Sequence, residues 1–210
     1  MESHLKAGAD PNGIIIDTEG YSDNLYGFIL EDCYDDEAHW KRLPIITEIL
    51  LKYGLDISNP RIPYDGDNVF HPFDQFAFEG YDYVTCLQTM KLFLDSGLPA
   101  NEAAECWEHA MFDWYNLGCY LEDADAPGYI DMARKMLFIS SYPHVLTEDK
   151  RLQEAISLSD NSYDPTHFQN IDDYEFKLNI PANTDPSFLR RAMVSVIEKS
   201  TGRTVWNFTP

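Results

Sequence analysis

The fold is decided by a short stretch that closes three successive helical runs. Its first copy is Leu5-Lys6-Ala7-Gly8-Ala9-Asp10-Pro11-Asn12, its second is Leu51-Lys52-Tyr53-Gly54-Leu55-Asp56-Ile57-Ser58, and its third is Leu94-Asp95-Ser96-Gly97-Leu98-Pro99-Ala100-Asn101. The glycines fall at positions 8, 54 and 97, at intervals of 46 and 43 residues. A motif that recurs at a period of about 20 to 50 residues indicates a repeated structural unit.

Each glycine is expected to end a helix. Apolar residues precede the second and third glycines at helical spacing, namely Ile45, Ile46, Ile49 and Leu50, and then Leu87, Met90, Leu92, Phe93 and Leu94. Glycine lacks a Cβ and adopts the left-handed backbone conformation that commonly follows the last helical turn. The repeated stretch therefore predicts three helix C-termini.

A family resemblance rests on these turns and on a second motif. Residues 5–12 resemble the end of an ankyrin repeat, where the second helix closes on Leu-x-x-Gly-Ala-Asp-x-Asn before a finger-like hairpin loop. Residues 20–28, and more closely 71–80, resemble the Thr-Pro-Leu-His-x-Ala-Ala-x-x-Gly opening of the first helix. Pro72, Phe73, Ala77 and Gly80 match that opening, whereas Asp74 and Phe76 depart from it.

The resemblance covers residues 4–143 and implies a fold. It implies a mostly α chain, an ankyrin-like solenoid of stacked helix pairs with extended finger loops, closed by a C-terminal capping element with a short strand or hairpin. The family period is about 33 residues, so the extra residues are assigned to loops. The finger insertions contain residues 14–18 and 60–67, and the insertions between helices contain 33–42 and 81–84.

The chain is expected to form a single domain over residues 1–210. Residues 4–143 are the predicted repeat body, with divergent helices at 103–117 and 128–140, and residues 144–210 are the predicted cap. Within the cap the pattern predicts a helix at 148–158, a loop at 161–169, a strand at 174–180, a helix at 187–198 and a short strand at 205–208. Asp185-Pro186 favours that last helix, because aspartate caps helices and proline suits the first turn.

Charge excludes several partners. The chain has 36 acidic and 15 basic residues and a formal charge of −21. Residues 185–210 carry +2, so residues 1–184 carry −23. A protein that binds nucleic acid neutralises phosphates with lysine and arginine, so we expect neither nucleic acid nor an anionic membrane as a direct ligand. Apolar stretches such as 14–16 and 136–139 are far shorter than a spanning helix requires, and we expect a cytoplasmic protein.

The sequence gives little support for a catalytic or metal-binding site. The six histidines show no His-Glu-x-x-His spacing, and Glu105 with His109 suggests a surface pair more than a ligand pair. Asp65-Gly66-Asp67-Asn68 begins like a calcium loop, but Phe70 and Phe76 occupy the sixth and twelfth positions. The four cysteines form no Cys-x-x-Cys pair and are expected to be buried thiols. We expect no metal, no cofactor and no enzymatic activity.

Acidic and aromatic residues coincide in five places. Tyrosine and tryptophan bring large rigid contact areas to interfaces, and neighbouring carboxylates speed association with a basic partner. Taken singly, these tyrosines are better explained by packing and these carboxylates by solubility, whereas together they favour binding. The predicted partner-binding residues are Tyr34, Asp35, Asp36, Glu37, Tyr64, Asp65, Asp67, Tyr81, Asp82, Tyr83, Asp113, Trp114, Tyr115, Glu122 and Asp123.

Several functions compete. The first is a non-catalytic protein-binding module, monomeric when free, of the acidic immunity or inhibitor type that neutralises a basic toxin or nuclease. A scaffold or effector that docks on another protein, or a DNA mimic that occupies a nucleic-acid-binding protein, would show the same charge. The remaining alternative is a hydrolytic enzyme with a cleft at the C-terminal cap that uses His109 or His167 with nearby carboxylates.

Overall fold

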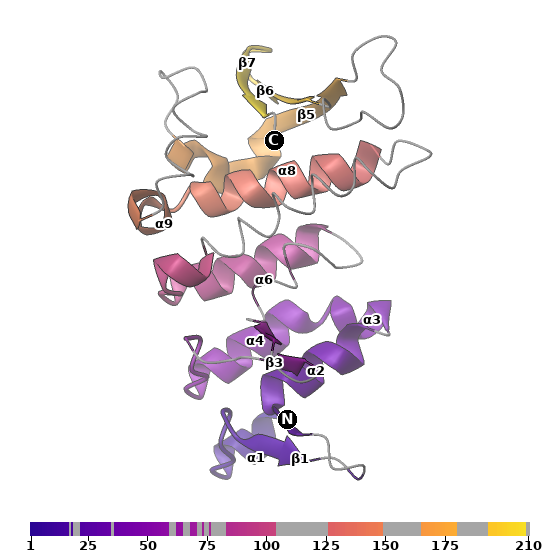
Figure 1. The fold of residues 1–210 in the computed structure, drawn as a ribbon, viewed down its shortest axis with the longest axis vertical. Coiled ribbons are helices and arrows are strands. Elements are labelled where there is room, and N and C mark those ends of the chain that lie inside the picture. Colours follow the sequence, from indigo (N-terminus) through magenta and orange to yellow (C-terminus); the bar gives the residue numbers. More distant parts are fainter. Residues whose placement is uncertain are drawn as a thin grey trace. The chain divides into compact units, whose positions relative to one another are not determined.

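The computed structural model describes the chain in several segments, and these divide into two compact units. The described residues are 1–16, 18, 22–34, 36–58, 62–64, 68–70, 73, 76, 83–103, 126–148, 165–179 and 193–208. The first unit is Met1–Glu102 and the second is Ala103–Pro210 (Figure 1). The expectation of a single domain, made of a repeat body at residues 4–143 and a cap at residues 144–210, stays a prediction.

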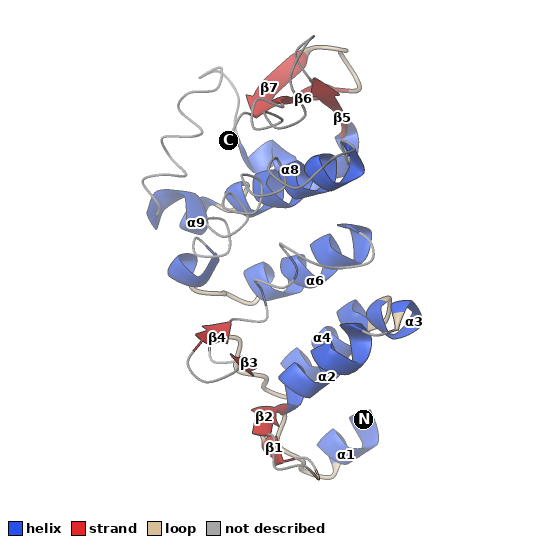
Figure 2. Cartoon of the chain, turned by 45° about the vertical axis from the view of Figure 1, so that its right-hand side comes forward, coloured by secondary structure: helices blue, strands red, loops and turns tan. Residues whose placement is uncertain are grey.

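The first unit combines helices with two small hairpins (Figure 2). Its helices are α1 (Glu2–Lys6), α2 (Leu25–Tyr34), α3 (Glu37–Trp40), α4 (Leu43–Lys52) and α6 (Tyr83–Asp95). Strand β1 (Ile14–Ile16) pairs antiparallel with β2 (Ser22–Asn24), and β3 (Ile62–Tyr64) pairs antiparallel with β4 (Asn68–Phe70). Strands β1 and β3 lie within the two predicted finger insertions, 14–18 and 60–67, whereas their partners β2 and β4 follow those stretches.

The three predicted helix ends are confirmed. Gly8, Gly54 and Gly97 have φ values of +95°, +92° and +88°. In each case the residue after the glycine donates its N–H to a carbonyl five positions earlier, at 3.0 Å for Ala9 and Leu55 and 3.1 Å for Leu98. This is the six-to-one bond of a Schellman motif, which satisfies a carbonyl that the helix end leaves open.

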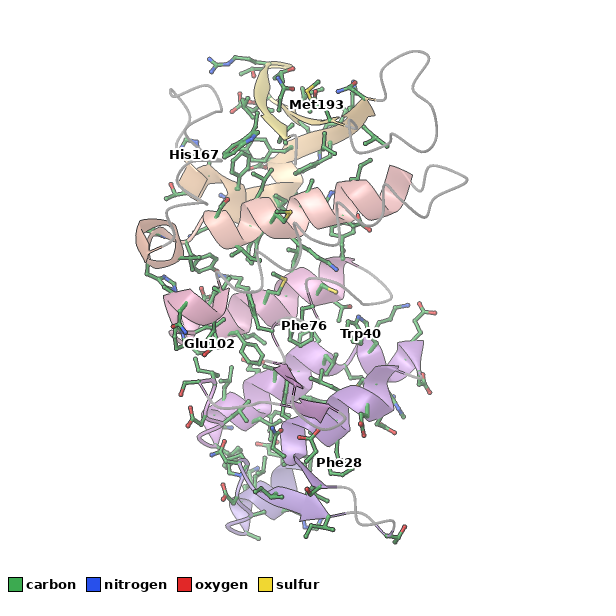
Figure 3. All side chains as sticks on the ribbon, in the orientation of Figure 1. Phe28, Trp40, Phe76, Glu102, His167 and Met193 are labelled. Carbon is green, nitrogen blue, oxygen red and sulfur yellow. The ribbon has the colours of Figure 1, made fainter. Side chains whose placement is uncertain are left out.

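Aromatic side chains form the core of the first unit. Phe93 of α6 lies 5.7 Å from the ring of Tyr26 and 6.0 Å from the ring of Phe76. Trp40 lies 6.1 Å from Phe76 (Figure 3). All four of these side chains are buried. The hydroxyl of Tyr26 shares a hydrogen bond of 2.6 Å with that of Thr47, so α2 is tied to α4 through a buried polar contact.

The second unit packs helices against a sheet. Helix α8 (Ala126–Ser140) is followed by α9 (Pro143–Glu148) and by the 3-10 segment η1 (Pro165–Asp173). Strands β5 (Tyr174–Asn179), β6 (Met193–Glu198) and β7 (Thr204–Phe208) form an antiparallel sheet in the order β5-β6-β7. Helix α8 contacts η1, β5 and β6. Phe168 of η1 is fully buried, 5.2 Å from Tyr174 and 5.5 Å from Trp206.

The prediction of a mostly α, ankyrin-like solenoid is wrong. The described residues contain three separate antiparallel sheets beside their helices, so the fold class is mixed α and β. The capping element expected to hold a short strand or hairpin is a three-stranded sheet. The periodicity of the helix ends was a sound observation about local turns, but it did not determine how the remaining residues pair.

Two local predictions are also corrected. The expected helix at 187–198 is wrong over residues 193–198, because this segment is the central strand β6, with Val194 and Val196 buried between β5 and β7. β-Branched residues at alternate positions fit a pleated strand better than a helix. The loop expected at 161–169 is replaced from Pro165 onward by η1. The predicted helix at 128–140 is confirmed by α8, and the predicted strand at 174–180 is confirmed over Tyr174–Asn179, with residue 180 outside the described residues.

No helix among the described residues has both the length and the apolar character needed to cross a bilayer.

Candidate functional site

An acidic corner lies where α2 gives way to α3. We use this name for Glu31, Asp32, Asp36 and Glu37, whose side chains are all exposed. Asp36 follows α2 in an extended conformation and caps α3, because its Oδ1 accepts hydrogen bonds from the N–H groups of Ala38 at 2.7 Å and His39 at 3.3 Å. Nδ1 of His39 lies 3.1 Å from Oδ2 of Asp32 and 4.0 Å from Oδ2 of Asp36, so one imidazole ring adjoins carboxylates from both sides of this junction.

The hydrogen bonds of the corner favour the ionised form of Asp36. The hydrogen bonds from the backbone of Ala38 and His39 lower the pKa of Asp36. Nδ1 of His39 lies 3.1 Å from Oδ2 of Asp32, and Nζ of Lys41 lies 2.6 Å from Oε1 of Glu37. From residue 7 to residue 40 the sequence contains nine carboxylates and no lysine or arginine. The corner is therefore the end of a long negative segment.

An isoleucine edge lies at the other end of α2. We use this name for β1, where Ile14, Ile15 and Ile16 are 76%, 39% and 69% exposed. Strand β2 joins β1 directly to α2, since β2 ends at Asn24 and α2 begins at Leu25. Single exposed apolar residues are ordinary, whereas three consecutive ones in a strand make β1 a candidate contact surface. The sequence analysis assigned these residues to an insertion and missed them, although three consecutive β-branched residues signal a strand.

A buried carboxyl group fixes the junction between the isoleucine edge and α2. Asp23 is 2% exposed, and its Oδ1 accepts the N–H of Asn24 at 2.6 Å. Its Oδ2 has no hydrogen-bond partner in the described part of the chain. Burial raises the pKa of Asp23 to about 6. Asn24 caps α2 by accepting the N–H of Gly27 at 2.8 Å, and a Cβ at Gly27 would overlap the Asp23 carboxyl group.

The structure places only part of the predicted binding set. Asp36 and Glu37 belong to the acidic corner, and Tyr83 is the partly exposed first residue of α6. Tyr34 ends α2 and Tyr64 ends β3. The other ten predicted residues lie outside the described residues: Asp35, Asp65, Asp67, Tyr81, Asp82, Asp113, Trp114, Tyr115, Glu122 and Asp123. The predicted set omitted Glu31 and Asp32, two exposed carboxylates near the C-terminal end of α2.

No group of three or more His, Cys, Asp or Glu side chains among the described residues is arranged to hold a metal ion. Cys33 and Cys86 are buried free thiols, and burial raises the pKa of Cys33 to about 11, which keeps the thiol protonated at neutral pH. His167 is an exposed residue of η1, and His109 lies outside the described residues.

Known proteins offer no parallel. No family model, no curated protein and no solved structure matches the chain. The ankyrin resemblance therefore stays a sequence resemblance of the turn motifs, and the site is argued from its own geometry.

Proposed function

We propose that the chain is a non-catalytic protein-binding module that masks a basic surface of another protein, and that this partner is a basic toxin or nuclease. The observation that carries the proposal is the pairing of the acidic corner with the isoleucine edge at the two ends of α2. Ten helical residues span about 15 Å, which is within the reach of one standard protein interface. Both charge and apolar area are thus available to one partner.

The charge favours a partner that normally binds phosphates. A nuclease binds its substrate with lysine and arginine, so carboxylates arranged on a protein surface compete for the same cationic groups. The lack of any lysine or arginine from residue 7 to residue 40 also supports this partner class. We further propose that the chain acts as a monomer in the cytoplasm, where buried free thiols such as Cys33 and Cys86 stay reduced.

The test begins with capture of the partner. The tagged chain is used to capture proteins from its native lysate at about 0.1 M and about 1 M salt, a range over which the Debye length falls from about 10 to about 3 Å. We expect one stoichiometric basic protein at low salt and a large loss at high salt. Failure to capture any stoichiometric protein at low salt, or capture that salt does not weaken, would contradict the proposal.

The captured protein is then measured against matched variants. Glu31→Gln with Asp32→Asn removes two charges of the acidic corner and leaves the Asp36 cap intact. The control is Glu175→Gln, which removes an exposed carboxylate on β5 in the second unit. We expect the double variant to lower the association rate and the control to leave it unchanged, because steering depends on charges near the interface. Equal effects of both variants would contradict a site at the corner.

The identity of the partner separates the remaining functions. A captured nuclease or toxin whose activity the chain inhibits supports neutralisation. A protein that binds nucleic acid without cleaving it, and that the chain displaces from its ligand, identifies a DNA mimic. A captured protein whose activity is unchanged in the complex identifies a scaffold or docking role.

A further inference from the structure

The backbone of β1 has one edge in use and one open. Strand β1 pairs with β2 in the register Ile14 with Asn24, Ile15 with Asp23 and Ile16 with Ser22, and within the described part of the chain it pairs with no other strand. The N–H of Leu25 donates to the carbonyl of Gly13 at 3.1 Å, which extends the same register by one pair. The pairing pattern of β1 can therefore be assigned residue by residue.

In this register the backbone groups of Ile14 and Ile16 point away from β2. In an antiparallel pair, residues that exchange hydrogen bonds alternate with residues that do not. Since Gly13 bonds toward β2, Ile15 does so too, and the N–H and C=O groups of Ile14 and Ile16 point away from β2. The side chains of Ile14 and Ile16, the two most exposed of β1, lie on one face. Each of these residues thus offers a donor, an acceptor and an apolar side chain.

Proteins normally protect such an edge. Lysine, proline or a bulge on an edge strand prevents unwanted pairing, and β1 has none of these within its three isoleucines. The protection here is of another kind, because the surrounding segment from residue 7 to residue 40 carries nine carboxylates and no lysine or arginine. Two copies of the chain would bring these carboxylates together, whereas a basic segment would neutralise them. The negative charge around β1 therefore favours pairing with a basic strand over pairing with a second copy of the chain.

We propose that the open edge of β1 accepts an extended segment of the basic partner as an added strand. This inference rests on the proposed function and names the part of the partner that is recognised. Main-chain hydrogen bonds to Ile14 and Ile16 supply affinity, as in other complexes formed by strand addition. The segment carries apolar residues at alternate positions, beside the exposed isoleucine side chains, and lysine or arginine at the positions between them.

The probe is a fluorescent decapeptide of alternating lysine and valine, and its binding is followed by anisotropy at about 0.1 M salt. The decisive variant is Ile16→Pro, which removes one outward N–H and breaks no bond between β1 and β2. The matched control is Ile16→Thr, which retains the donor and suits a strand. We expect the proline variant to weaken binding by about tenfold or more, since the ring also obstructs the edge, and the threonine variant to weaken it less.

A second measurement keeps the inference testable if the proline variant unfolds. In the unaltered chain, saturating peptide should slow hydrogen exchange at the amides of Ile14 and Ile16 and leave that of Ile15, already bonded to β2, nearly unchanged. Binding that Ile16→Pro leaves intact, with no added protection at residues 14 and 16, would overturn strand addition while leaving the acidic surface standing. No binding of the peptide at this salt would also overturn strand addition, whereas the proposed function is decided separately by the salt-dependent capture of a basic protein. A dimer of the chain that Ile16→Pro dissolves would show that a second copy occupies the edge, and would overturn the inference.

Discussion

The Oδ1 atom of Asn12 accepts a hydrogen bond of 2.7 Å from the N–H of Asp56, which lies 44 positions later in the chain. The other end of the same amide, Nδ2, donates to the carbonyl of Gly54 at 2.9 Å. One side chain thus pairs with two backbone groups of the next helix-ending turn, as a neighbouring peptide would. The turns themselves are alike, because Asp10 accepts the N–H of Asn12 and Asp56 accepts the N–H of Ser58.

Replacing Asn12 with alanine should therefore weaken the first unit more than an ordinary surface change does. Two hydrogen bonds are lost at an exposed site, and we expect the free energy of unfolding to fall by about 1–2 kcal/mol. Urea denaturation measures this loss. The comparison variant is Asn12→Asp, which retains an acceptor for Asp56 but loses the donor to Gly54. Alanine and aspartate variants as stable as the original chain would show that the amide does not contribute.

The glycine turns make a second prediction. Gly54 has a φ of +92° and open space where a Cβ would stand, so alanine there is opposed by backbone conformation alone. Gly54→Ala should lower the free energy of unfolding by about 1–2 kcal/mol. Gly54→Asn should cost less, because asparagine tolerates the left-handed region. An alanine variant no less stable than the asparagine variant in thermal denaturation would refute this explanation.

Asp23 should give the stability an unusual dependence on pH. The folded pKa is raised to about 6 by burial, above the ordinary value of 3.8. Between these values the folded chain holds a proton that the unfolded chain has lost, so this group's contribution is full below pH 3.8 and declines as pH rises through 6. The difference in unfolding free energy between the original chain and Asp23→Asn, measured by denaturant titration, should fall over this window. Parallel curves for the two proteins would show an unshifted carboxyl group.

Asp36 separates structural from electrostatic roles at the acidic corner. Asp36→Ala removes the cap of α3 and should lower the free energy of unfolding by about 1 kcal/mol. Asp36→Ser retains a capping oxygen and loses the charge, so it should keep the stability of the original chain and show slower association with a basic partner. Calorimetry and stopped-flow binding measure the two effects. Equal stability of the alanine and serine variants would argue against the cap.

An aromatic cluster around Phe168 should contribute strongly to the stability of the second unit. Phe168 is fully buried and lies near both Tyr174 and Trp206. Phe168→Ala should cost about 3–5 kcal/mol, and Phe168→Leu less, because leucine leaves a smaller cavity. Near-ultraviolet circular dichroism during denaturation follows the loss of aromatic packing. A loss under about 1 kcal/mol for the alanine variant would mean that the unit is held elsewhere.

The helix ends could be predicted because their cause is local. A glycine after an apolar run needs only its own backbone freedom to end a helix, and Gly8, Gly54 and Gly97 do so. The strands could not be predicted in the same way, because a strand forms only by pairing with another segment, and the local sequence does not indicate which segment that is. The cap signal Asp185-Pro186 led to a predicted helix through residue 198, but residues 193–198 pair with β5 and β7 on both sides, and this pairing decides in favour of a strand. Tertiary pairing of this kind overrides local preference.

The sequence predicted the negative charge of the candidate site but not all of the residues that form it. Asp36 and Glu37 were found because they belong to the unbroken acidic run that follows Tyr34, whereas Cys33 separates Glu31 and Asp32 from that tyrosine. The isoleucine edge was missed because residues 14–16 were assigned to a loop insertion, where exposure of three apolar side chains is not expected. Asp23 gave no signal at all, since its burial depends on the space that Gly27 leaves open.

The burial of Trp40 has a practical consequence for all of these experiments. Trp40 is 1% exposed and is the only tryptophan in residues 1–102. Trp107, Trp114 and Trp206 all belong to the second unit. With those three replaced by phenylalanine, the emission spectrum of the chain reports on the first unit alone and should shift to longer wavelength when that unit opens. A single indole ring thus serves as a built-in optical probe of the half of the molecule that carries the proposed binding surface.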